Sequence, residues 1–170
     1  ENKLFDLSNK VSVITGGNGG IGLGIAEGLA SSGGNVAILG RNEEKNKLAK
    51  SSLDKYGTKI ETYKIDVSEE SQVKDIIGGV VNDFGRIDSV FANAGINVYG
   101  GSFEEMDTDV YRKVLSVNLD GVFFTLRESC KHMVERAKNG DPGGSLIGVA
   151  SLAGIEGAAK TQPYSASKGG

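Results

Sequence analysis

The sequence predicts an α/β protein built on a doubly wound parallel sheet with helices on both faces. Short β-rich segments alternate with longer helical segments along the chain, and strict alternation of strand and helix implies right-handed crossovers and a parallel sheet. A glycine-rich turn also stands between the first expected strand and the first expected helix. Both observations indicate the same fold class.

The expected elements follow one another without a domain boundary. Segments rich in β-branched and apolar residues predict strands at 11–15, 35–39, 59–65, 89–92 and 145–149. The longer stretches between them predict helices at 20–32, 43–55, 69–83 and 107 to about 138. Several strands are mostly apolar, which suits burial on both faces of a parallel sheet. The clearest loop, 139–144, is short, so we expect a single domain over residues 1–170.

Glycine is the outlier in the composition, at 26 of 170 residues. No G-x-y repeat or proline- and serine-rich bias accompanies it, so the glycines are expected in turns and at helix packing points. The chain is 38% hydrophobic and 24% charged, which suffices for one globular domain with a core.

Charge and residue patterning exclude several kinds of partner. A net charge of −3 without a basic stripe disfavours nucleic acid. Apolar runs are too short to span a bilayer, and residues 1–10 are too polar for a signal peptide. The single cysteine, Cys130, excludes an intrachain disulfide and fits a reducing cytoplasm. Neither Cys130 nor the single histidine, His132, has ligand-like neighbours, so no metal site is predicted.

The glycine-rich turn at 15–22, with the sequence TGGNGGIG, predicts a dinucleotide site. A strand that turns sharply into a helix aims free N–H groups and the positive dipole end at one point, and glycines let a pyrophosphate approach the backbone. Three spacings fit: G-x-G-x-x-G on Gly17, Gly19 and Gly22; T-G-x-x-G-x-x-G ending on Gly22; and T-G-x-x-x-G-x-G on Gly16, Gly20 and Gly22. The glycines alone leave the choice among them open.

Tyr164 and Lys168 stand four residues apart, so on a helix a phenol and an ammonium share one face. A tyrosine has an ordinary pKa of about 10. A lysine charge about 4 Å away, at an effective dielectric of about 20, would favour the phenolate by roughly 4 kcal/mol before desolvation. That effect moves the tyrosine pKa toward the range useful in general acid or base catalysis. By itself the Y-x-x-x-K spacing is unspecific, because it also occurs by chance on helix surfaces.

Taken in order along residues 10–170, five features resemble the short-chain dehydrogenase/reductase family. They are the turn read as T-G-x-x-x-G-x-G, Asp66-Val67 after the third strand, Asn93-Ala94-Gly95 after the fourth, Asn118 in the long helix, and Ser151 ahead of Tyr164-x-x-x-Lys168. The Asn-Ala-Gly motif is similar to the oxidoreductase branch rather than the sugar-nucleotide epimerase branch, and so favours this glycine spacing. Ala92 departs from the pattern, because many members carry asparagine there. The resemblance implies a Rossmann-type fold.

The resemblance implies catalytic roles for Asn118, Ser151, Tyr164 and Lys168. Tyr164 gives a proton to a carbonyl oxygen or takes one from an alcohol while the cofactor transfers hydride. Lys168 holds the nicotinamide ribose and lowers the tyrosine pKa, Ser151 hydrogen-bonds the substrate oxygen, and Asn118 anchors a water in a proton relay. From the residues alone, Ser151 could equally belong to a turn, and Asn118 could be a polar interruption of an apolar helix face.

The resemblance also implies an NADP(H) or NAD(H) cofactor, with NADP(H) favoured. The second strand ends on Gly40 and Arg41 rather than on the carboxylate that NAD enzymes offer to the ribose hydroxyls, and an arginine can accept a 2′-phosphate. The alternative is that Arg41 faces solvent, with Glu43 and Glu44 weakening the positive field. Asp66 is expected to accept the adenine amino group, or else to serve a turn. The residues expected to bind the cofactor are Gly16, Asn18, Gly20, Ile21, Gly22, Arg41, Asp66, Val67, Asn93, Ala94, Gly95, Tyr164 and Lys168.

The expected activity is hydride transfer between NADP(H) and a ketone or alcohol, as in a carbonyl reductase, an alcohol dehydrogenase or a 3-oxoacyl reductase. The small, nearly uncharged segment 154–162 is expected to line the substrate pocket. Because family members continue past the Tyr-Lys helix, we expect a C-terminally incomplete domain whose complete protein is a homotetramer or homodimer. The alternative is a non-catalytic dinucleotide-binding protein or an inactive fragment of such an enzyme.

Overall fold

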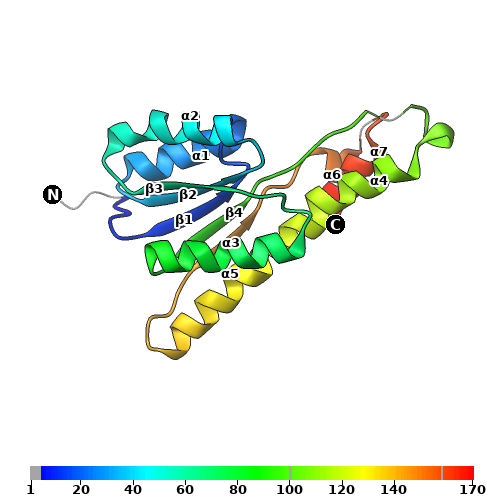
Figure 1. The fold of residues 1–170 in the computed structure, drawn as a ribbon. Helices are drawn as coiled ribbons and strands as arrows, with labels where there is room; N and C mark the ends of the chain where they lie inside the picture. The colour runs from blue at the N-terminus through cyan, green and yellow to red at the C-terminus, as the bar shows by residue number, and fades with distance from the viewer. Residues whose placement is uncertain (1–4, 100, 158) are drawn as a thin grey trace.

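A five-stranded parallel sheet runs through the protein, in a computed structural model that describes residues 5–99, 101–157 and 159–170 (Figure 1). Its strands are β1 (Val11–Thr15), β2 (Asn35–Gly40), β3 (Ile60–Lys64), β4 (Ser89–Ala92) and β5 (Ser145–Gly148). They lie in the order β3-β2-β1-β4-β5, so the direction in which strands are added reverses between β1 and β4. In this fold, ligands bind at the carboxyl ends of the strands beside that reversal. The predicted fold class is confirmed.

Helices cover both faces of the sheet (Figure 1). On one face lie α1 (Gly20–Ser31) and α2 (Glu43–Leu53), and on the other α3 (Glu70–Phe84) and α5 (Gly121–Lys138). Neighbouring strand residues alternate between two buried clusters: Val13 and Leu39 pack with α3, whereas Ile14 and Ile38 pack with α1 and α2. Because both faces are covered, β1 is buried along its whole length and β2 from Val36 onward, and most of their residues are apolar.

The expected single helix over 107–138 is instead α4 (Thr108–Leu115), a π-helical turn (Ser116–Asp120) and α5. A π-helical turn holds one more residue than an α-helical turn, and such turns are frequent at functional sites. Hydrophobic periodicity does not reveal a single inserted residue, so the sequence showed one continuous helix.

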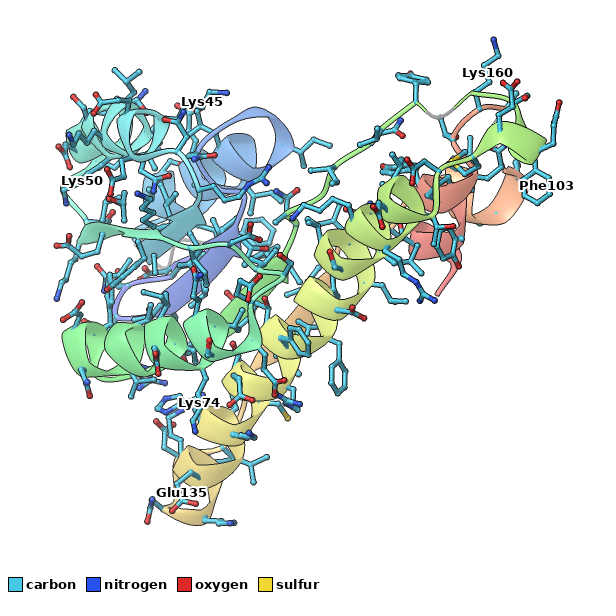
Figure 2. All side chains as sticks on the ribbon, turned by 45° about the vertical axis from the view of Figure 1, so that its right-hand side comes forward. Lys45, Lys50, Lys74, Phe103, Glu135 and Lys160 are labelled. Carbon is cyan, nitrogen blue, oxygen red and sulfur yellow. The ribbon has the colours of Figure 1, made fainter. Side chains whose placement is uncertain are left out.

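Short elements complete the chain. Two 3₁₀ turns (Asp54–Tyr56 and Phe103–Glu105) precede two C-terminal helices, α6 (Ala153–Glu156) and α7 (Gln162–Gly169). Figure 1 shows α4, α6 and α7 together at one end of the molecule, and Figure 2 places Phe103 and Lys160 at its far tip. The predicted Tyr-Lys helix is thus present as α7, whereas α6 was not expected.

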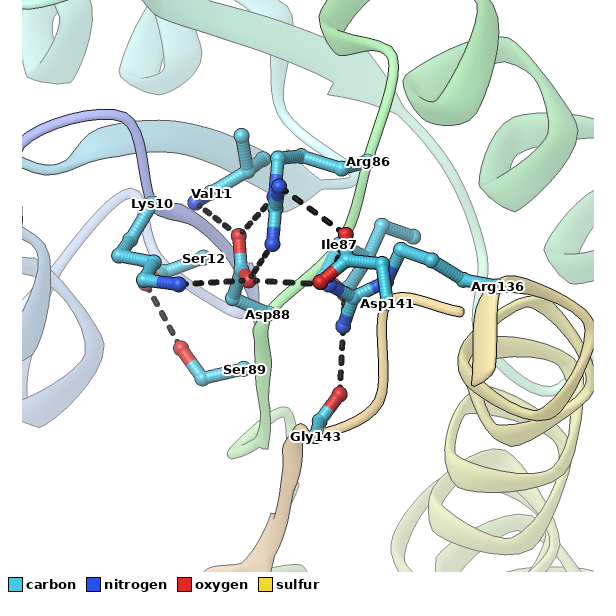
Figure 3. Close-up of polar contacts among 10 residues, drawn as sticks. All are labelled: Lys10, Val11, Ser12, Arg86, Ile87, Asp88, Ser89, Arg136, Asp141 and Gly143. Carbon is cyan, nitrogen blue, oxygen red and sulfur yellow. Dashed lines mark hydrogen bonds and ion pairs between the residues drawn. The ribbon is translucent and has the colours of Figure 1, made fainter. Parts of the chain in front are cut away.

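Asp88 ties the amino ends of the strands to α5 (Figure 3). Its carboxylate accepts hydrogen bonds from Arg86 (2.6 and 2.8 Å) and from the Val11 N–H (2.9 Å). The amine of Lys10 and Nη1 of Arg136, on α5, each lie 3.5 Å from the same carboxylate. Burial alone would raise the pKa of Asp88, but the hydrogen bonds from Arg86 and Val11 and the charges of Arg86 and Lys10 outweigh burial and lower that pKa below its usual range.

Replacing Asp88 with asparagine keeps an acceptor for the Val11 N–H but removes the charge. We expect the free energy of unfolding to fall by about 2 kcal/mol near neutral pH, because Arg86 and the buried Arg136 then keep only the more exposed Asp141 as a carboxylate partner. The pKa of Asp88 is lower in the folded than in the unfolded state. Its contribution is therefore present above the unfolded pKa of about 4 and disappears as the pH falls through the folded pKa.

Chemical denaturation of the wild type and Asp88→Asn across the acid range measures this difference. The matched control is Glu44→Gln, which breaks the exposed Glu44–Lys47 pair and is expected to change stability little. A difference between wild type and Asp88→Asn that stays constant down to the lowest pH would contradict the assignment.

Candidate active site

The carboxyl ends of β1, β2 and β4 border a cavity of about 390 Å³. Most of the residues expected to bind a cofactor line it: Gly16, Asn18, Gly20, Arg41, Asp66, Val67, Asn93, Ala94 and Gly95. Ile21, which is 70% exposed, and Gly22 are not among the lining residues. The glycine-rich turn and the loop after β4 therefore meet at one cavity, on the side of the sheet where the fold class predicts a ligand.

The backbone of the turn requires three of its glycines. Gly16 (φ +66°) and Gly20 (φ +51°) have left-handed conformations that favour glycine. A Cβ on Gly22 would overlap the Gly16 carbonyl and lie 2.6 Å from Nδ2 of Asn93. Gly19, by contrast, has open space and an extended φ of −179°. This geometry favours the T-G-x-x-x-G-x-G spacing over the two alternatives.

The first turn of α1 is suited to an anion. Its N-cap residue, Gly19, has no side chain to cap the free N–H groups, and the turn holds no acidic residue. Uncapped N–H groups and the positive end of the helix dipole attract phosphate. The turn therefore fits the pyrophosphate of a dinucleotide.

Thr15 and Asn93 lock the loop after β4 against this turn. The backbone N–H groups of Asn93 and Ala94 both donate to Oγ1 of Thr15 at 3.0 Å. Nδ2 of Asn93 donates to the Thr15 carbonyl at 3.0 Å. The side of the cavity formed by β1 and β4 is therefore fixed by hydrogen bonds between the two strand ends.

Two cations, Arg41 and Lys45, line the cavity where β2 ends. Lys45 lies on the first turn of α2 (Figure 2). The neighbouring Glu43 and Glu44 form ion pairs with other lysines, at 3.4 and 3.0 Å, so their charges are locally balanced. Sequence reasoning missed Lys45, because it stands among the other charged residues of α2 and nothing in the local sequence separates it from them.

Asp66 serves a turn and also lines the cavity. Its Oδ1 accepts hydrogen bonds from the N–H (3.0 Å) and the hydroxyl (2.6 Å) of Ser68. Burial alone would raise the pKa of Asp66, but Ser68, with Lys113 and Arg41 nearby, outweighs burial and lowers that pKa. Asp66 therefore stabilises the turn through its Oδ1. The same residue also lines the cavity.

Asn118, in the π-helical turn, is buried and joins two segments of the site. Its Oδ1 accepts from the Ile96 N–H (2.8 Å), while Nδ2 donates to the Ile96 carbonyl (2.9 Å) and to Oγ of Ser167 (3.0 Å). The Ser167 hydroxyl in turn donates to the Tyr164 carbonyl (2.8 Å). Because both amide hydrogens are used, the Asn118 side chain positions α7 and the loop after β4. Its expected role in anchoring a relay water stays a prediction.

Lys168 lies close both to the Tyr164 ring and to Gly95, which lines the cavity. Its Nζ is 5.8 Å from the centre of the Tyr164 ring and donates to the Val149 carbonyl at 2.6 Å. A Cβ on Gly95, a cavity residue, would lie only 3.7 Å from this Nζ and 3.3 Å from Oδ1 of Asn118. The structure therefore brings Tyr164, Lys168 and Asn118 together at the edge of the cavity of about 390 Å³.

Ser151 forms a turn ahead of α6. Its Oγ accepts the Ala153 N–H at 3.2 Å, so its own hydroxyl hydrogen can still be donated to a ligand. The segment 154–162, of which residue 158 lies outside the described part, packs against α7: a Cβ on Gly154 would overlap the Lys168 carbonyl. Neither Ser151 nor Tyr164 lines the cavity of about 390 Å³ or the cavity of about 280 Å³ beside Asn118 and Lys168.

The described residues contain neither a candidate membrane span nor a candidate metal-binding cluster. None of their helices is both long and apolar enough to cross a membrane. Their histidine, cysteine, aspartate and glutamate side chains form no group of three or more that could hold a metal ion.

Residues 10–170 match the family model of short chain dehydrogenases. The chain is 36% identical over 153 residues to a sorbose reductase of Schizosaccharomyces pombe, covering 89% of this chain and 58% of that protein. It is 38% identical over 164 residues to an NADP-dependent (R)-specific alcohol dehydrogenase of Lentilactobacillus kefiri, covering 96% and 62%. The crystal structure of an NAD⁺-bound xylitol dehydrogenase matches with a TM-score of 0.91 at 33% identity, covering 98% and 62%. The chain thus spans about three fifths of the length of these proteins.

Proposed function

Because the chain belongs to the short-chain dehydrogenase family of oxidoreductases, we propose that it transfers hydride between NADP(H) and a small ketone or alcohol. One observation carries this proposal: Gly95 lines the nucleotide cavity and at the same time lies against Lys168 and Asn118. The place for the cofactor and the groups for proton transfer are therefore adjacent. When bound, the nicotinamide supplies or accepts the hydride.

The residues of the chain handle the proton and the orientation of the substrate. The Tyr164 hydroxyl makes no hydrogen bond with any residue in the described ranges, so it can give a proton to a carbonyl oxygen or take one from an alcohol. Lys168 places a positive charge beside that ring. Ser151 donates its hydroxyl hydrogen to the substrate oxygen, and Asn118 holds α7 in place through Ser167. We propose that one dinucleotide-binding domain, formed around the single sheet, carries all these groups.

The experiment that tests this function follows NADPH consumption with a panel of ketones and sugars, and NADP⁺ reduction with the matching alcohols. Turnover of at least one pair supports the oxidoreductase. Nucleotide binding without turnover across the whole panel would support the alternative of a non-catalytic dinucleotide-binding protein. The cytoplasmic location and the homo-oligomeric state stay predictions.

For the cofactor, we propose NADP(H) in preference to NAD(H). The relatives leave the choice open, since one is named as NADP-dependent and one structure holds NAD⁺. Arg41 and Lys45 support NADP(H), because two cations at the end of β2 can bind a 2′-phosphate. The ion pairs of Glu43 and Glu44 reduce the opposing field.

Arg41→Ala is expected to weaken NADPH binding by about 10- to 100-fold, the loss typical of a charge-assisted hydrogen bond to phosphate, and to leave NADH binding almost unchanged. Fluorescence titration of each nucleotide measures both dissociation constants. Lys74→Ala is the control, because it removes an exposed cation of α3 that does not line the cavity. Equal losses for NADPH and NADH, or tighter NADH than NADPH binding by the wild type, would overturn the preference.

A further inference from the structure

A buried asparagine on α2 contacts the glycine-rich turn from outside the cavity. Asn46 is 3% exposed, and its Nδ2 donates to the carbonyls of Gly40 (3.0 Å) and Tyr63 (3.3 Å), at the ends of β2 and β3. Its Oδ1 accepts a hydrogen bond of 2.6 Å from Nδ2 of Asn18. Both amide hydrogens of Asn46 are thus fixed by the sheet, and its oxygen is presented to the turn.

Asn18 is the one residue other than glycine at positions 16–20. A run of glycines has many accessible backbone conformations and loses more entropy on ordering than other residues do. Among these five residues, only Asn18 has a side chain that can hold the tip of the turn in one conformation. That side chain is hydrogen-bonded to Asn46. Asn18 itself lines the cavity.

Gly40 leaves room for this contact. A Cβ at position 40 would overlap Nδ2 of Asn18 and lie 2.7 Å from Oδ1 of Asn46. The amide pair thus occupies the space that any side chain at the end of β2 would take. Asn18, Gly40 and Asn46 together form a unit that we call the amide clamp.

We propose that Asn46 is a positioning residue for the nucleotide, which holds Asn18, and through it the tip of the turn, in the conformation that receives the cofactor phosphates. The inference rests on the proposed function, because its ligand is NADP(H). A turn that is ordered before binding loses less entropy when the nucleotide binds, so the clamp increases affinity without touching the ligand.

A double-mutant cycle tests the clamp, with Asn18→Ala, Asn46→Ala and the double variant titrated with NADPH. We expect each single substitution to weaken NADPH binding by about tenfold, and the double variant to bind no more weakly than either single variant, because the effect of Asn46 passes through Asn18. Additive losses would overturn the proposal. So would a lower melting temperature of Asn46→Ala with an unchanged dissociation constant.

Leu53→Val is the matched control, because Leu53 is a buried residue of α2 that packs in the cluster beneath α1. It is expected to lower the melting temperature while leaving NADPH binding unchanged, which separates loss of stability from loss of positioning. If Asn46→Ala does not fold, Gly40→Ala replaces it in the cycle, since its added Cβ displaces Asn18 from Asn46.

The outcomes also separate the clamp from the function on which it rests. A wild-type chain that binds neither NADPH nor NADH would overturn both. A wild type that binds NADPH, with additive effects in the cycle, would overturn the clamp alone.

Discussion

Tyr164→Phe is expected to lower kcat by at least about 100-fold, the lower end of the contribution of general acid–base catalysis. The substitution removes only the phenol oxygen, which makes no hydrogen bond with the described residues, and it leaves a ring beside Lys168. Stability and NADPH affinity should therefore stay close to those of the wild type. Steady-state rates, an NADPH titration and a melting curve on the same preparation measure all three quantities.

The control for this prediction is Tyr56→Phe, which removes a tyrosine hydroxyl that donates to Glu27 at 2.8 Å, away from the cavity. Its kcat should equal that of the wild type. If Tyr164→Phe also kept full activity, Tyr164 could not be the proton donor. If it lost NADPH binding together with activity, the residue would act in binding the nucleotide rather than in moving a proton.

Gly22→Ala is expected to remove most nucleotide affinity and to destabilise the fold. The added Cβ would overlap the Gly16 carbonyl, which belongs to the backbone and cannot rotate away. Forcing a methyl group into a packed site costs roughly 1–3 kcal/mol. The accompanying shift of α1 moves its first N–H groups off the phosphate, so we expect NADPH affinity to fall by at least about tenfold.

Gly24→Ala provides the comparison, because it makes the same chemical change on the same helix in open space. Alanine in a helix is more favourable than glycine by about 0.5–1 kcal/mol, so this variant should melt at an equal or higher temperature and bind NADPH normally. A similar loss of binding in both variants would show that the spacing of Gly16, Gly20 and Gly22 does not determine the site.

The sequence was sufficient for the strands, because burial on both faces of the sheet, as at Val13 and Ile14, requires short runs of mostly apolar residues. It was not sufficient for the turn, because the conformations of Gly16 and Gly20 and the crowding at Gly22 depend on the loop after β4, which is distant in sequence. Packing contacts of this kind leave no local signal.

Two positions on α2 were missed for a related reason. In the sequence, Lys45 and Asn46 look like surface residues of a charged helix. The orientation of α2 against the sheet places Lys45 at the cavity and Asn46 in the interior. The π-helical turn is a third case, because the register of Asn118 depends on its bonds to Ile96 and Ser167. Helix rotation and register are set by tertiary packing rather than by local sequence.

The Asp88 cluster lies at the amino ends of β1 and β4, whereas the nucleotide cavity lies at their carboxyl ends. Residues that fasten the sheet and residues that contact the ligand are thus separated by the length of a strand. Substitutions at distant sites usually have independent effects. Substitutions at the carboxyl ends of the strands, in evolution or by design, can therefore alter cofactor and substrate choice while the Asp88 cluster at the amino ends keeps the protein folded. This separation favours the diversification of function on this scaffold.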